Sequence, residues 1–77
     1  MTAHLDQPLL SFEQAREAYQ LAGAMVQARK EAEKEAEGPA AAIQAKADTA
    51  RAELDQMKAE IAFRIAHAQL MALLGLE

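Results

Sequence analysis

Apolar residues recur every three or four positions along two long stretches of the chain, which is the spacing of one face of an α-helix. In the second stretch the apolar positions are Ile43, Ala47, Ala50, Leu54, Met57 and Ile61, continued by Ile65, Ala68 and Ala72. In the first stretch they are Phe12, Ala15, Tyr19, Ala22 and Val26. This pattern predicts two amphipathic helices that pack against each other along these two stripes.

Helix-terminating and helix-starting residues predict where the two helices begin and end. Pro8 disfavours a helix before it, so residues 1–10 are predicted to form an irregular N-terminal arm. Ser11 followed by Gln14 is a capping-box pattern, which predicts a first helix over 12–37. Gly38 and Pro39 predict a turn at 38–39, followed by a second helix over 39–74 that Gly75 ends. The hairpin as a whole is expected to occupy residues 11–77.

A two-residue break between long helices predicts an all-α fold, a long antiparallel two-helix hairpin with coiled-coil-like packing. Folding about Gly38 places Tyr19 opposite Met57 and Ala22 opposite Leu54. The composition agrees, because strong helix formers dominate and the 77 residues include only three glycines and two prolines. We therefore expect more than about two-thirds of the chain to be helical, well above the usual third.

The end of the second helix is unusually apolar. Phe63, Leu70 and Leu74 are expected to lie away from the hairpin seam, because they fall on a different face from Ile61 and Ile65. The second helix is also expected to extend beyond the start of the first. The predicted partner-binding residues at this open end are Phe63, Leu70, Met71, Leu74, Leu9, Leu10 and Phe12.

The short length of the chain favours assembly with another chain. A core of this size is marginal, and a chain without cysteine has no disulfide to stabilise it. The sequence therefore predicts a homodimer that completes a four-helix bundle. A protein hetero-partner, or cover of the apolar end by the N-terminal arm, is the alternative.

The residues that commonly carry chemistry are few and scattered. His4 and His67 are the two histidines, and neither stands at metal-ligand spacing such as Glu-x-x-His or His-Glu-x-x-His. The hydroxyl residues have no histidine close in sequence, and no glycine-rich phosphate loop occurs. We therefore expect no enzyme activity, no cofactor and no metal site.

Charge and hydropathy narrow the class of partner. A net charge of −4 disfavours a nonspecific grip on nucleic acid, and no apolar run is long enough to cross a bilayer. Residues 1–10 lack the pattern of a signal peptide, so a cytoplasmic location without membrane insertion is expected. The expected function is a non-catalytic protein–protein interaction module, such as a small adaptor, a chaperone-like cofactor or a regulatory subunit.

Two alternative functions remain. An acidic inhibitor that mimics nucleic acid would concentrate its carboxylates on one face, but here lysines and arginines are interleaved with them. A nucleic-acid-binding helical bundle of the plasmid-regulator type would need a basic stripe. Arg51, Lys58 and Arg64 do lie roughly along one side of the second helix, although Asp48 and Asp55 lie close by.

The stretch 59–76, A-E-I-A-F-R-I-A-H-A-Q-L-M-A-L-L-G-L, resembles the helix ends of TolC-like outer-membrane efflux proteins. Those proteins contain long alanine-rich helical hairpins. The resemblance implies a helical hairpin and carries no expectation about activity.

Overall fold

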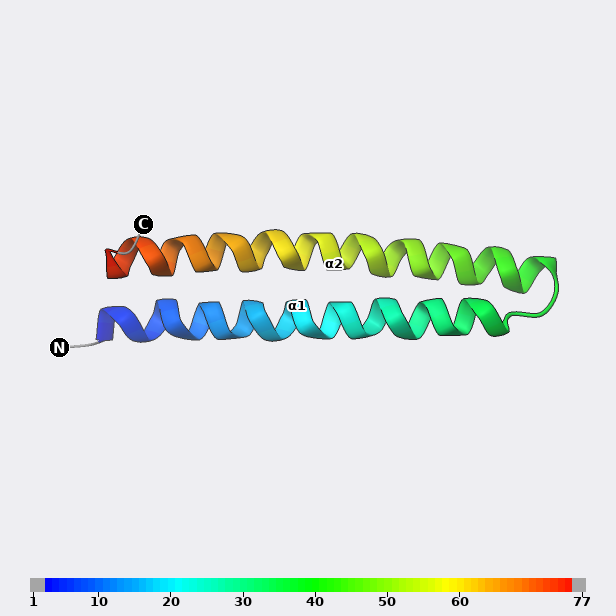
Figure 1. Cartoon of the computed structure of the whole chain (residues 1–77), viewed down its shortest axis with the longest axis horizontal. Coiled ribbons are helices and arrows are strands. Elements are labelled where there is room, and N and C mark those ends of the chain that lie inside the picture. Colours follow the sequence, from blue (N-terminus) through cyan, green and yellow to red (C-terminus); the bar gives the residue numbers. More distant parts are fainter. Residues whose placement is uncertain (1–2, 76–77) are drawn as a thin grey trace.

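The computed structural model describes residues 3–75 and consists of two antiparallel helices joined by a short turn (Figure 1). Helix α1 spans Ala3–Glu35 and helix α2 spans Pro39–Leu74. The described part is 94% helical and contains no strand, which confirms the predicted all-α hairpin. The molecule is a rod with extents of 60 × 18 × 13 Å. Residues 1, 2, 76 and 77, which belong to the predicted arm and hairpin, lie outside the described residues.

Helix α1 begins much earlier than the sequence predicts. It starts at Ala3 and continues through Pro8, so residues 3–10 are helix and not an irregular arm. Ser11 is exposed inside the helix and does not cap it. Pro8 removes one backbone donor, but it stands in the second turn, so only the first turn of α1 is affected. The added turns bring the start of α1 level with the end of α2, and the expected overrun of the second helix is absent (Figure 1).

Glycines set the turn and the end of α2, as predicted. Gly38 has φ 88° and ψ 157°, a region that is essentially restricted to glycine, and its carbonyl accepts a 3.0 Å hydrogen bond from the Ala42 N–H. Pro39 occupies the first turn of α2, where its missing N–H is not needed. Gly75 is left-handed at φ 72° and donates its N–H to the Ala72 carbonyl at 3.2 Å. Helix α1 ends at Glu35, slightly before the predicted residue 37.

The seam between the helices uses the predicted face of α1 and a different face of α2. Val26 is buried, and the other stripe residues of α1 (Phe12, Ala15, Tyr19 and Ala22) are half-buried. On α2 the half-buried residues Ala42, Asp48, Glu60 and Met71 lie at the edges of the seam. The buried and half-buried positions along its centre are Ala45, Thr49, Ala52, Gln56, Ala59, Phe63, Ala66 and Leu70. These alternate by four and three, the heptad spacing of a coiled coil. The predicted α2 seam is therefore wrong in rotation about the helix axis.

Along the axis the predicted register is nearly right. Gly23 lies against Gln56, and the rings of Phe12 and Phe63 are 5.4 Å apart. Both pairs are within three residues of the predicted pairing. The helices are therefore aligned as expected, with α2 turned so that its small residues meet α1.

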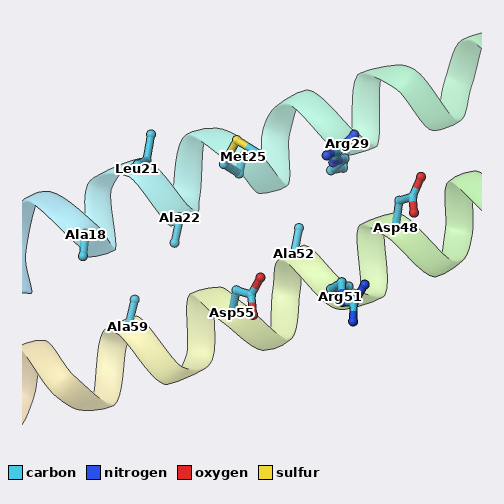
Figure 2. Close-up of a pocket in the computed structure, with 10 residues that line it drawn as sticks. All are labelled: Ala18, Leu21, Ala22, Met25, Arg29, Asp48, Arg51, Ala52, Asp55 and Ala59. Carbon is cyan, nitrogen blue, oxygen red and sulfur yellow. The ribbon is translucent and has the colours of Figure 1, made fainter.

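Small side chains fill the middle of the seam and let the two backbones approach. Figure 2 shows Ala18 and Ala22 pointing from α1 toward α2, with Ala52 and Ala59 pointing back. The buried hydroxyl of Thr49 donates a 3.0 Å hydrogen bond to the Ala45 carbonyl, so this polar group is satisfied inside the seam. Larger seam residues lie in the open half of the hairpin, where the Phe63 ring packs between the rings of Phe12 and Tyr19.

Candidate docking surface

The side of α2 that faces away from α1 carries a line of large apolar side chains, which we call the outer stripe. Each is half exposed or more, and Ile43 reaches 70%. Exposed alanines fill the positions between them. The large members of the outer stripe are Ile43, Leu54, Met57, Ile61 and Ile65, and the small members are Ala47, Ala50 and Ala68.

The outer stripe and the seam lie on nearly opposite sides of α2. At 100° per residue, the centre of the outer stripe lies about 150° around the helix from the line through Thr49 and Ala52. Helix α2 is therefore apolar on two sides. Because α1 covers only one of them, the second remains open to another protein surface.

A small hollow lies within the outer stripe. Met57, Glu60, Ile61 and Arg64 surround it, and its volume is about 140 Å³. These residues are spaced i, i+3, i+4 and i+7, which is the set of four that receives one side chain of a facing helix in knobs-into-holes packing. The Arg64 guanidinium and the Glu60 carboxylate form an ion pair beside it, so the charges at its edge are matched.

Two rows of charged side chains flank the outer stripe. Lys46, Glu53, Glu60 and Arg64 follow one side, and Arg51 and Lys58 follow the other. Glu53 also reaches Lys30 of α1 at 3.9 Å, a long and exposed ion pair. Such pairs contribute little stability. One flank thus carries two basic and two acidic residues, and the other is basic.

The structure separates the residues that the sequence predicted as partner-binding. Leu70 is buried inside the hairpin at 5% exposure, and Phe12, Phe63 and Met71 are half-buried. The expectation that Phe63 and Leu70 face away from the seam is therefore wrong. The exposed members are three leucines at the open end, Leu9, Leu10 and Leu74.

The sequence pattern contains the outer stripe but predicts that these residues form the seam with α1. Its strongest members, such as Leu54 and Ile61, were therefore absent from the predicted docking residues. A second four-and-three pattern, through Ala45, Thr49 and Ala52, runs along the same helix and could have shown that two faces compete for α1.

A shallow groove of about 450 Å³ runs between the helices on one side of the hairpin (Figure 2). Its apolar part includes Leu21 and Met25 of α1, both exposed. Two arginines and two aspartates stand around it: Arg29, Asp48, Arg51 and Asp55. The mixed charges and the lack of a nucleophile with a neighbouring base among these lining residues give the groove no evident catalytic chemistry.

The described residues contain no group of histidine, cysteine, aspartate and glutamate side chains that could hold a metal ion. His67 lies against two phenylalanine rings, with centroids 5.7 Å from Phe12 and 6.3 Å from Phe63. His67 is thus part of the aromatic packing at the open half. No helix within residues 3–75 is long and apolar enough to cross a membrane.

Comparison with protein families, with curated protein sequences and with solved structures finds no significant match to this chain.

Proposed function

We propose that this chain is a non-catalytic protein–protein interaction module that docks another helical chain on the outer stripe of α2. The observation that carries the proposal is the continuous line of five large apolar side chains, each half exposed or more. Scattered exposed apolar residues are normal, but a contiguous patch of this kind marks an interaction site. A small adaptor, a chaperone-like cofactor and a regulatory subunit would each use such a surface.

A helix is the partner element that fits the outer stripe best. The stripe is long, straight and one helix face wide, and its hollow has the residue spacing that receives a single helical knob. The simplest partner is a second copy of the chain, which would give a homodimer of four helices.

The small core of the hairpin supports the need for a partner. Among the described residues, only Val26, Ala52 and Leu70 are buried apolar side chains. A core this small leaves a chain of this length with marginal stability. Cover over the outer stripe would add apolar burial that the hairpin alone lacks.

The open end also carries exposed leucines, three of which were predicted as partner-binding. Leu9, Leu10 and Leu74 are each between 45% and 49% exposed. Their part in partner binding, predicted from the sequence, stays a prediction and is secondary to the outer stripe.

Site-specific photo-crosslinking in the cells that produce the protein tests the proposal. A benzophenone amino acid at Leu54, in the outer stripe, is expected to give a covalent adduct with a protein chain. The matched control places the same amino acid at Gln20, which is exposed on the outer side of α1. Absence of a protein adduct from position 54, or equal adducts from position 20, would contradict the proposed function.

A further inference from the structure

We infer that the occupant of the outer stripe is a second copy of this chain, with the two α2 helices parallel and in register. The four helices then form one flat layer in the order α1, α2, α2, α1. This inference rests on the proposed function, because it names the partner of the same surface.

The exposed area of the hairpin has the size that a dimer would cover. The chain exposes 5846 Å². A compact monomer of this mass exposes about 4,600 Å². The excess is more than about 1,000 Å², and a standard protein interface buries about 800 Å² on each partner. One further copy on one side is therefore enough to bring the chain into the ordinary range.

The positions of the two apolar faces decide the arrangement of the helices. In a square four-helix bundle each helix meets its two neighbours at roughly 90°. The seam and the outer stripe are about 150° apart on α2, so helices packed on both faces lie almost in a row.

The outer side of α1 explains why such a row would stop at four helices. Leu10 and Leu21 are exposed there, but they form no continuous line of large apolar residues. Exposed polar side chains surround them: Glu13, Gln20, Gln27, Glu31 and Lys34. The assembly is therefore closed, as expected for a two-fold dimer.

The flanking charges favour a parallel pair of α2 helices. A two-fold axis parallel to the helices places the row with Glu53 and Glu60 against Arg51 and Lys58 of the second copy. Glu53 and Glu60 then face a row of opposite charge, whereas Lys46 and Arg64 face a row of like charge. An antiparallel pair places each row against itself, so that the basic row faces another basic row. Only the parallel pair therefore brings the basic row near carboxylates, and flanking charges of this kind influence the orientation of paired helices.

The hollow in the outer stripe fits the same arrangement. In a parallel, in-register pair, the knob that faces the residues around this hollow is Ile61 of the second copy. Since the pair is symmetric, each Ile61 enters the hollow of the other chain. This reciprocal contact fixes the register of the two α2 helices near Ile61.

Single cysteines test the orientation directly, because the natural chain has none. Ala47→Cys and Ala68→Cys stand on the outer stripe about 30 Å apart along α2. In the parallel dimer each variant is expected to form a disulfide with its own copy on mild oxidation, about tenfold faster than the control Gln20→Cys on α1. A disulfide that forms only in a mixture of the two variants, or from neither, would overturn the parallel arrangement.

Sedimentation equilibrium on charged variants tests the second copy as occupant. Ile61→Glu is expected to weaken the dimer by about a hundredfold, because it places a charge in the contact. Leu21→Glu is the matched control, since Leu21 is at least as exposed as Ile61 but lies on α1. Circular dichroism confirms that both variants keep the helical hairpin. A wild type that stays monomeric near millimolar concentration, or equal weakening by both variants, would overturn the inference.

The two proposals fail in distinguishable ways. The purified chain could be monomeric while the photo-crosslinker at Leu54 captures a different protein. In that case the inference of a second copy as occupant is wrong, and the proposed function as an interaction module is retained. If neither a dimer nor any adduct forms, both proposals are wrong.

Discussion

Gly23 of α1 lies against the side-chain amide of Gln56 on α2, so closely that a Cβ at position 23 would stand 3.4 Å from Gln56 Nε2. The half-buried glutamine occupies a seam position of the heptad, and Gly23 lies opposite it. A polar residue at such a position favours one alignment of two helices over others. Gln56 and the buried Thr49 are the polar positions along the centre of an α2 seam that is otherwise built largely from alanine.

Gly23→Ala is expected to stabilise the hairpin by about 0.5–1 kcal/mol, because alanine forms helix better than glycine and leaves the unfolded chain less freedom. The 3.4 Å contact is with the end of a flexible side chain, which can move by a few tenths of an ångström. Urea denaturation at one protein concentration measures the change. Gly23→Val is the control and should destabilise, since its larger side chain displaces Gln56. A loss of stability in the alanine variant would mean that the helices approach more closely at this point.

The sequence predicted the fold well because its evidence was local. Two runs of helix formers around Gly38 and Pro39 allow little except a helical hairpin, and the spacing of the runs also sets the approximate alignment of Gly23 with Gln56. Pro8 misled the prediction for the start of α1, because a proline within the first two turns interrupts few backbone hydrogen bonds.

The rotation of α2 could not be read from its own pattern. Both the outer stripe and the alanine-rich face have helical periodicity, and the choice between them depends on which one fits α1. The large rings of Phe12 and Tyr19 require space, which the face with Ala59 and Ala66 provides. The rule that the most apolar face is buried within the chain fails for α2, whose outer stripe is exposed in the hairpin.

The aromatic cluster should depend on Phe63. Its ring lies 5.4 Å from that of Phe12 and 5.8 Å from that of Tyr19. Phe63→Ala removes both contacts and is expected to cost about 3 kcal/mol. Phe63→Leu is the control, because it keeps most of the volume and should cost less than half as much. Thermal unfolding gives the stabilities, and near-ultraviolet circular dichroism of Tyr19 should weaken in the alanine variant. An unchanged tyrosine spectrum would contradict the packing of Tyr19 on this ring.

The turn should require glycine at position 38 because of its backbone conformation, and not because a side chain would clash with neighbouring atoms. A Cβ at this position would meet nothing within 4 Å, but φ is 88°. Gly38→Ala is therefore expected to cost about 1–3 kcal/mol through backbone strain alone. A chain made by chemical synthesis with D-alanine at position 38 supplies the control, since a D-residue favours positive φ, and it should be as stable as the natural chain. If both alanines destabilise equally, the turn must adopt another conformation.

Leu70 and Leu54 offer a matched comparison between the seam and the outer stripe, because the same truncation acts on opposite sides of α2. Leu70 is 5% exposed, so Leu70→Ala leaves a cavity within the hairpin and is expected to cost about 2–5 kcal/mol at every protein concentration. Leu54 is 50% exposed, and Leu54→Ala should change the stability of the separate hairpin by less than about 0.5 kcal/mol.

Concentration then distinguishes the roles of these two leucines. If the outer stripe is covered by a second chain, the cost of Leu54→Ala should grow from low-micromolar to near-millimolar protein, because mass action couples assembly to folding. Denaturation curves of the wild type and both variants at the two concentrations provide the measurement. A Leu54→Ala cost that is large even in the dilute sample would place Leu54 in the seam, and a cost that stays small in the concentrated one would leave the outer stripe uncovered. A Leu70→Ala cost that is small at both concentrations would show that α2 packs on α1 through another face.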